Sequence, residues 1–284
     1  MLEILFGSPK EAETIYDIFR SMCKELHSEL QIINQHCVKI SPKTWDISIE
    51  QLVIPGMVRY IIDHKEHQII LTIIKEIYYF LDEEEQQQIL HITQSIIEGE
   101  RTDLPRVQHF SLRDEILSDA LVQFLRPNLC FSFTSFQKFR LQKYMARIRD
   151  YVDVAIEEYK MEQEYQNFIQ SLRDYLTTKD SVIDSISIIH DKGYFVYHST
   201  NQKMMNQELK KYTDETFVKQ HPMYIDKDLL APIVSIAPNW ISLYTDDPFD
   251  GMVQTIQNIF QERVLIHSLN EFSAHIRTGE NRSQ

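Results

Sequence analysis

A helical pattern of apolar residues between Thr134 and Leu176 is the longest periodic feature of the chain. At about 100° per residue, the apolar positions of its first half fall within about 80° of one another, on one face of a helix. From Met161 onward, the apolar positions lie about half a turn away. The pattern therefore predicts a helix that buries one face in its first half and the opposite face in its second half. The two apolar sets are Leu141, Met145, Ile148, Val152, Ile156 and Tyr159, then Tyr165, Phe168, Ile169, Leu172, Tyr175 and Leu176.

The start and the continuity of this helix are predicted from the residues around it. Thr134 and Gln137 have the spacing of a capping box, and neither glycine nor proline occurs between Pro127 and Gly193. A continuous helix of about 40 residues would be about 60 Å long, whereas the mean helix has about 11 to 12 residues. Two alternatives therefore stay open: one continuous helix, or a helix pair that is kinked near Tyr159 to Glu162.

Patterns before this helix predict a small β-α-β-β unit over residues 1–50 and a helical region over residues 51–127. Ser8-Pro9 has the residue types of an N-cap and a first helical position, and the helix that follows is expected to reach about Gln31. Alternating apolar residues predict strands at Leu2–Phe6, His36–Ser41 and Thr44–Glu50. Further helices are expected at 51–64, 66–81, 83–98 and 111–125.

The central helix is assigned to residues 128–180, a C-terminal α+β region to residues 181–277, and a polar, disordered tail to residues 278–284. Asp191-Lys192-Gly193 separates two strand-like runs and predicts a hairpin. Pro238-Asn239 is interpreted as the turn of a second hairpin, and Asp247 as the N-cap of a helix. The expected strands are 186–190, 194–198, 234–237, 240–244 and 264–267, and the expected helices are 203–220 and 248–261. Together these elements predict an α+β fold that is predominantly helical.

The charge of the central helix changes sign close to the point where its apolar stripe changes sides. Residues 137–149 carry five basic side chains and no acid, whereas residues 150–164 carry six acids and only one base, Lys160. The whole chain has a net charge of −13, which repels nucleic acid and anionic membranes unless a local basic patch overcomes it. Broad binding to polyanions is therefore disfavoured.

Composition excludes several classes of protein. The six glycines stand apart from one another, so the chain contains no classical nucleotide-binding loop. Its apolar runs are far shorter than the about 18 residues of a membrane span, and its first residues lack the basic region of a signal peptide. We therefore expect a cytoplasmic protein. Cys23, Cys37 and Cys130 form no C-x-x-C pair and are expected to be reduced, mostly buried thiols.

Three groups of side chains could in principle support chemistry, and a structural role is favoured for each. His64 and His67 have the i, i+3 spacing of metal ligands but lack an obvious third ligand, so a solvated polar helix junction is favoured. For the glutamates at 157, 158, 162 and 164, solvation or pairing with basic residues is favoured over catalysis. Asp246, Asp247 and Asp250 lack the order of a calcium loop and fit helix capping better. The sequence therefore predicts no catalytic residue, no metal and no cofactor.

The strongest candidate site is a surface of the central helix that combines basic and aromatic residues. Arg140, Lys143 and Arg147 share one helix face and have aromatic neighbours, a combination found on surfaces that bind nucleic acid. Because the chain is strongly acidic, we favour pairing of these cations with its own carboxylates. The apolar residues of the second half lie on the same side of the helix, which predicts an interaction face for a partner protein or a homodimer. Its residues are Phe136, Phe139, Arg140, Lys143, Arg147, Tyr165, Phe168 and Leu172.

Two strings in the central helix are distinctive. The first is Phe136-Gln137-Lys138-Phe139-Arg140-Leu141, and the second runs from Glu157 to Tyr165 with the form E-E-Y-x-x-E-x-E-Y. With the apolar and basic residues around them, they resemble the YtxC-like family of spore-forming Firmicutes over about Leu112 to His267. The resemblance implies an association with sporulation, and it implies no catalytic residue, cofactor or ligand.

The leading prediction is a non-enzymatic, cytoplasmic protein that acts through protein contacts. The first alternative is a regulator that binds nucleic acid through Arg140, Lys143 and Arg147. A small-molecule enzyme is a third alternative, supported only by the length of the chain.

Overall fold

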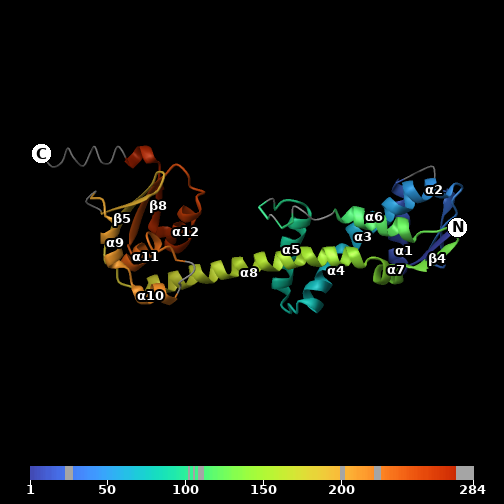
Figure 1. The fold of residues 1–284 in the computed structure, drawn as a ribbon, viewed down its shortest axis with the longest axis horizontal. Helices are drawn as coiled ribbons and strands as arrows, with labels where there is room; N and C mark the ends of the chain where they lie inside the picture. The colour runs from blue at the N-terminus through green and yellow to red at the C-terminus, as the bar shows by residue number, and fades with distance from the viewer. Residues whose placement is uncertain are drawn as a thin grey trace. The chain divides into compact units, whose positions relative to one another are not determined.

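A computed structural model describes residues 1–22, 28–101, 103–104, 106–107, 112–198, 202–220 and 225–272 (Figure 1). The chain forms two compact units, residues 1–160 and residues 161–284. Each unit contains one mixed four-stranded sheet and its own hydrophobic core. The fold is α+β and predominantly helical, as predicted. Among the helices described, none is both long enough and apolar enough to cross a lipid bilayer.

The first unit is built on a sheet with the strand order β2-β3-β1-β4. Strand β1 pairs antiparallel with β3 and parallel with β4. Alternate side chains such as Ile4 and Val38 are fully buried, because successive residues of a strand face opposite sides of the sheet. The strands are β1 (Leu2–Leu5), β2 (Leu30–Ile33), β3 (Cys37–Ile40) and β4 (Leu129–Ser132).

The predicted β-α-β-β order is present, but two of its elements were wrong. Helix α1 (Pro9–Met22) is followed by strand β2, where the helix was expected to continue to about Gln31. The predicted strand at Thr44–Glu50 is helical: α2 (Trp45–Ser48) leads into the π-helix η2 (Ile49–Val53). The buried residues here are Ser48, Ile49, Leu52 and Val53, which follow helical spacing, and the alternating Ile47 is 46% exposed.

Helices α3 to α6 lie within the helical region predicted at 51–127. Asp82 caps α5 by accepting a hydrogen bond of 3.0 Å from the Glu85 amide, as its acidic first turn suggested. The single helix expected at 66–81 ends in a π-helical turn that the sequence did not reveal. The elements are α3 (Ile54–His64), α4 (Glu66–Thr72), η3 (Ile73–Ile77), α5 (Glu83–Ile97), α6 (Arg113–Phe124) and α7 (Phe133–Arg140). The start of the central helix, assigned to residue 128 with a capping box at Thr134, was wrong, because Leu129–Ser132 form β4 and α7 begins at Phe133 after the N-cap Ser132.

The central helical pattern is interrupted at Leu141 and not near Tyr159 to Glu162. Helix α7 ends at Arg140, Leu141 has φ −94° and ψ 22°, and α8 (Gln142–Thr178) then runs for 37 residues. Of the two alternatives, the helix pair divided near Tyr159 to Glu162 is therefore wrong, because α8 continues through these residues.

The change of apolar face along α8 follows the division of the chain into two cores. Leu141, Ile148 and Tyr159 of the first set belong to the core of the first unit. Phe168 and Leu172 of the second set belong to the core of the second unit. The boundary between the units, after Lys160, lies between the two apolar sets.

The second unit contains a sheet with the strand order β6-β5-β7-β8. Its predicted first hairpin is confirmed, since β5 and β6 pair antiparallel and Lys192 in the turn has a φ of 52°. Strands β5, β7 and β8 are parallel to one another. The elements are β5 (Ser185–His190), β6 (Tyr194–His198), β7 (Trp240–Thr245), β8 (Val264–His267), α9 (Asn206–Tyr212), α10 (Glu215–Gln220), α11 (Leu230–Ile236), α12 (Gly251–Phe260) and the 3-10 helix η4 (Gln261–Arg263).

The predicted second hairpin was wrong. Residues 234–236 belong to α11, every residue of which is buried, and Ala237 ends the helix in the left-handed conformation. Strand β7 pairs with β5 and not with the preceding segment. A short, continuously apolar run has no polar face, so its periodicity cannot separate a buried helix from a strand.

Three smaller predictions also change. The N-cap of α12 is Asp250, which accepts hydrogen bonds from the amides of Met252 and Val253, and not Asp247. Cys130 is exposed because Phe131, its neighbour on β4, takes the side of the strand that faces the core. Cys37 is half-buried. Cys23 and the predicted tail at 278–284 lie outside the described residues.

Replacing Gly56 with alanine should destabilise the first unit. An added Cβ would lie 2.5 Å from the Cδ1 and Cε1 atoms of Phe19, which is fully buried on α1. Such overpacking costs roughly 1–3 kcal/mol in the free energy of unfolding, measurable by urea denaturation followed by circular dichroism. The matched control is Gly251→Ala in α12, where an added Cβ meets no atom within 4 Å and stability should not fall. A Gly56→Ala protein as stable as the wild type would contradict the close packing of α1 on α3.

Candidate functional site

The structure brings together half of the predicted interaction face. Phe139, Arg140, Lys143 and Arg147 line a hollow of 680 Å³ between α6 and the α7–α8 segment. We call this hollow the basic groove. Its other charged lining residues are the acids Glu115, Asp119 and Asp150.

The other predicted residues belong to the two cores. Phe136 is buried in the first unit, and Phe168 and Leu172 are buried in the second. Tyr165 is half-buried against the second core, and its hydroxyl accepts a hydrogen bond of 3.1 Å from the amide of Asn258. The apolar stripe of the second half therefore packs inside its own unit.

The cations of the basic groove interact with nearby side chains. An Arg147 Nη1 atom lies 3.4 Å from the Asp150 carboxylate, so this cation pairs with an acid of the chain, as we favoured. The Arg140 guanidinium lies 5.3 Å from the centre of the Phe124 ring. The Phe139 side chain is 64% exposed, whereas Phe136 and Leu141, close to it in the sequence, are buried. The basic groove thus combines one exposed aromatic ring with charges of both signs.

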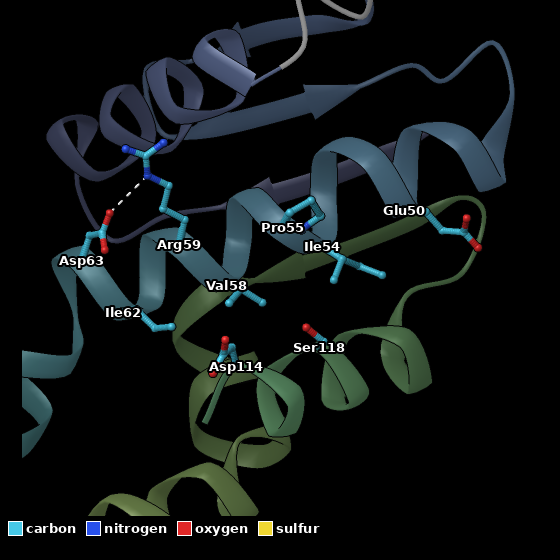
Figure 2. Close-up of a pocket in the computed structure, with 9 residues that line it drawn as sticks. All are labelled: Glu50, Ile54, Pro55, Val58, Arg59, Ile62, Asp63, Asp114 and Ser118. Carbon is cyan, nitrogen blue, oxygen red and sulfur yellow. Dashed lines mark hydrogen bonds and ion pairs between the residues drawn. The ribbon is translucent and has the colours of Figure 1, made fainter. Parts of the chain in front are cut away.

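A second groove lies on the opposite side of α6, between α6 and α3 (Figure 2). It has a volume of 510 Å³. Ile54, Val58 and Ile62 point into it from α3, and Asp114 and Ser118 point into it from α6 (Figure 2). We call it the acidic groove, because its lining also includes Glu50 and Asp63. Helix α6 is therefore a ridge between two grooves of different charge.

A buried network holds this ridge in place. The Glu66 side chain, on α4, accepts a hydrogen bond of 2.7 Å from the Tyr144 hydroxyl on α8. The Arg113 Nε atom, in the first turn of α6, lies 3.4 Å from the same carboxylate oxygen. Glu66 is only 7% exposed. Burial raises the pKa of Glu66, although the Tyr144 hydrogen bond and the Arg113 charge act in the opposite direction.

Sequence reasoning missed Glu66. Its neighbours His64 and His67 are exposed, as expected for a polar helix junction, but Glu66 itself is buried. Its partners come from α6 and α8, which lie far along the chain. No local pattern marked it, because a charged residue at a helix start is ordinarily solvated.

The other candidates have structural roles. The acidic residues of α8 pair with a neighbouring segment, since Glu158 lies 2.6 Å from Arg101 and Glu157 lies 3.0 Å from Arg106. Within the residues that the structure covers, no group of three or more His, Cys, Asp or Glu side chains could hold a metal ion. Asp250 is a helix cap, so capping is confirmed for this member of the aspartate cluster.

Comparison with known proteins agrees with the resemblance noted in the sequence. The model of the YtxC-like family matches residues 51–265, which include the basic groove and the Glu66 network. The Uncharacterized protein YtxC of Bacillus subtilis (strain 168) is 40% identical over 278 residues, which cover 96% of each chain. No solved structure matches the chain.

Replacing Glu66 with glutamine should change how stability depends on pH. The pKa of Glu66 is higher in the folded chain than its ordinary value of 4.5. Its contribution to stability is therefore full below that value and is lost as the pH rises through the folded-state pKa. Urea unfolding between about pH 4 and pH 8 should show the wild type losing stability relative to Glu66→Gln. The expected loss is about 1.4 kcal/mol for each tenfold difference in proton affinity between the folded and unfolded states.

The control for this experiment is Glu76→Gln, which removes an exposed glutamate of η3. Its stability difference from the wild type should not vary with pH over the same range. A pH-independent difference for Glu66→Gln as well would contradict the burial of the Glu66 carboxylate.

Proposed function

Because the chain belongs to the YtxC-like family, we propose that it is a non-catalytic cytoplasmic protein that acts in sporulation through contacts with another protein. The basic groove is the proposed contact site. The observation that supports it is the exposed Phe139 ring at the edge of a groove lined by three basic and three acidic residues. The association with sporulation rests on the family resemblance.

The chemistry of the basic groove suits a protein surface. Aromatic rings and arginines provide much of the binding energy at protein interfaces, and Phe139 and Arg140 supply both. Lys143 lies on the same side of α8, within reach of a partner carboxylate. A polar rim around one apolar anchor is the usual arrangement of such interfaces.

Nucleic acid fits the same groove less well. Binding to phosphates requires an excess of cations, whereas Glu115, Asp119 and Asp150 balance the three cations of the groove. The net charge of −13 adds a long-range repulsion. Nucleic acid is therefore the alternative outcome of the experiment that tests the proposal.

Reversing two charges of the basic groove should strongly weaken capture of the partner. Tagged wild type and an Arg140→Glu/Lys143→Glu variant are expressed in sporulating cells, crosslinked, and purified with and without nuclease. The wild type should retain a defined set of proteins after nuclease treatment. The amount of protein captured by the variant should be at least tenfold lower than with the wild type. A tenfold loss of affinity corresponds to about 1.4 kcal/mol of binding free energy.

The matched control is Lys138→Glu/Lys160→Glu, which makes the same change of charge at exposed positions outside the groove. It should capture the same proteins as the wild type. Equal capture by the groove variant would refute the basic groove as the contact site, and loss of all capture after nuclease would favour the nucleic-acid alternative.

A further inference from the structure

The acidic groove continues past the residues drawn as sticks in Figure 2. Glu50 and Ile54 also line an adjoining hollow of 240 Å³, together with Trp45 and Val122. Both hollows follow α6, and their α6 residues are Asp114, Ser118 and Val122. These residues are spaced four apart, so they form one stripe of about 12 Å along the helix.

The opposite wall is an apolar stripe of α3. Ile54, Val58 and Ile62 are also spaced four apart, so they face the groove from successive turns. Val122 on the α6 side is 58% exposed. Val58 and Ile62 are half-buried, and Ile54 is nearly buried, so the accessible apolar surface lies mainly at Val58, Ile62 and Val122. A groove between two neighbouring helices with such apolar positions is the kind of surface on which another helix packs.

Among the described residues, three acids at the rim of this channel form no ion pair, whereas the fourth, Asp63, is paired. Arg59 is paired with Asp63, its Nε atom lying 3.2 Å from the carboxylate. Arg126 donates hydrogen bonds to the carbonyls of Val122 and Leu125. Across the parts of the chain that the structure describes, Asp46, Glu50 and Asp114 form no ion pair. The rim therefore presents negative charge beside exposed apolar surface.

We propose that the acidic groove binds a basic amphipathic helix of a partner protein. The apolar residues of that helix, at i, i+3 or i+4, and i+7, pack on Ile54, Val58 and Ile62. Its lysines and arginines lie along the edges and pair with Glu50, Asp114 and Asp46. The negative charge of the rim disfavours nucleic acid and anionic membranes, since both carry the same sign of charge.

A folded second copy of the chain does not match this chemistry. Its most basic helical segment is 137–149, but the apolar residues there, such as Leu141, Tyr144 and Ile148, are already buried in its own core. Only Phe139 of that segment presents a large exposed apolar side chain. The proposed occupant is therefore a helix whose apolar face is free, and the acidic groove is separate from the basic groove on the other side of α6.

The test uses labelled peptides and the full chain. The probe is a helical peptide of about 14 residues, with leucines on one stripe and lysines on both flanks. Two comparison peptides have glutamate in place of every lysine, or the same residues in an order without a helical stripe. Fluorescence anisotropy should show saturable binding of the first peptide only. Equal binding of the reordered peptide would mean general attraction to an acidic protein and would overturn the proposal.

Two kinds of variant locate the binding site. Glu50→Lys/Asp114→Lys reverses the rim charges, and Ser118→Trp fills the channel with a large side chain at a half-buried position. Each should weaken peptide binding at least tenfold. The matched control is Glu115→Lys/Asp119→Lys, which makes the same charge change on the other side of α6. Because salt screens charges that the peptide does not contact, this control should bind the peptide nearly as tightly as the wild type. Circular dichroism verifies that each protein is folded.

Three results would overturn the proposal. The first is peptide binding that both acidic-groove variants, Glu50→Lys/Asp114→Lys and Ser118→Trp, retain. The second is an absence of binding by the wild type. The third is a wild-type dimer that the peptide dissociates and that Ser118→Trp abolishes, which would assign the groove to a second copy of the chain. Because the basic-groove variants Arg140→Glu/Lys143→Glu keep the acidic groove intact, failure here is distinguishable from failure of the proposed function.

Discussion

The buried carboxylate of Glu66 is the interaction on which the arrangement of the first unit depends. It joins Arg113 of α6 and Tyr144 of α8 to α4, three helices that are distant in sequence. Helix α6 has two fully buried side chains, Leu117 and Leu121, and packs Ile116, Ala120 and Phe124 partly buried against the same core. A buried ion pair contributes little net stability, but loss of one partner leaves an uncompensated charge. The network therefore fixes the position of α6, and it adds little to the net stability of the unit.

The position of α6 determines the charge of the two grooves. The helix is acidic on both sides, with Asp114 facing one groove and Glu115 and Asp119 facing the other. On the α8 side these acids face cations, and the groove carries charges of both signs. On the α3 side they face an apolar stripe with Glu50 at its edge, so negative charge accumulates. One acidic ridge thus produces two surfaces with different chemistry, because the walls opposite it differ.

The sequence predicted most helices and the first hairpin, since these have a clear period or an unambiguous turn. It failed at Thr44–Glu50, where the alternating residues suggested a strand but burial follows helical spacing. It also failed at Val234–Ala237, where a short apolar run fits a helix and a strand equally well. Of the candidate site, the cations of α7 and α8 were predictable because they share one face of the continuous helix that the sequence predicted. Their facing acids on α6 and the buried Glu66 were not, because only the tertiary fold brings these residues together. Local periodicity contains no information about which helix lies opposite.

The change of apolar face in α8 has a local cause. Between Tyr159, the last residue of the first core, and Phe168, the first of the second, no residue is fully buried. Lys160, Met161, Glu162, Gln163 and Glu164 are all strong helix formers, and the Gln166 side-chain amide donates a hydrogen bond of 2.7 Å to Glu162. Helix formation here is supported by propensity and by i, i+4 contacts, without a core to fix the apolar face. The apolar stripe can change sides in this segment because no buried residue fixes which face of the helix must be apolar. On either side of the segment, the apolar residues face the core of their own unit.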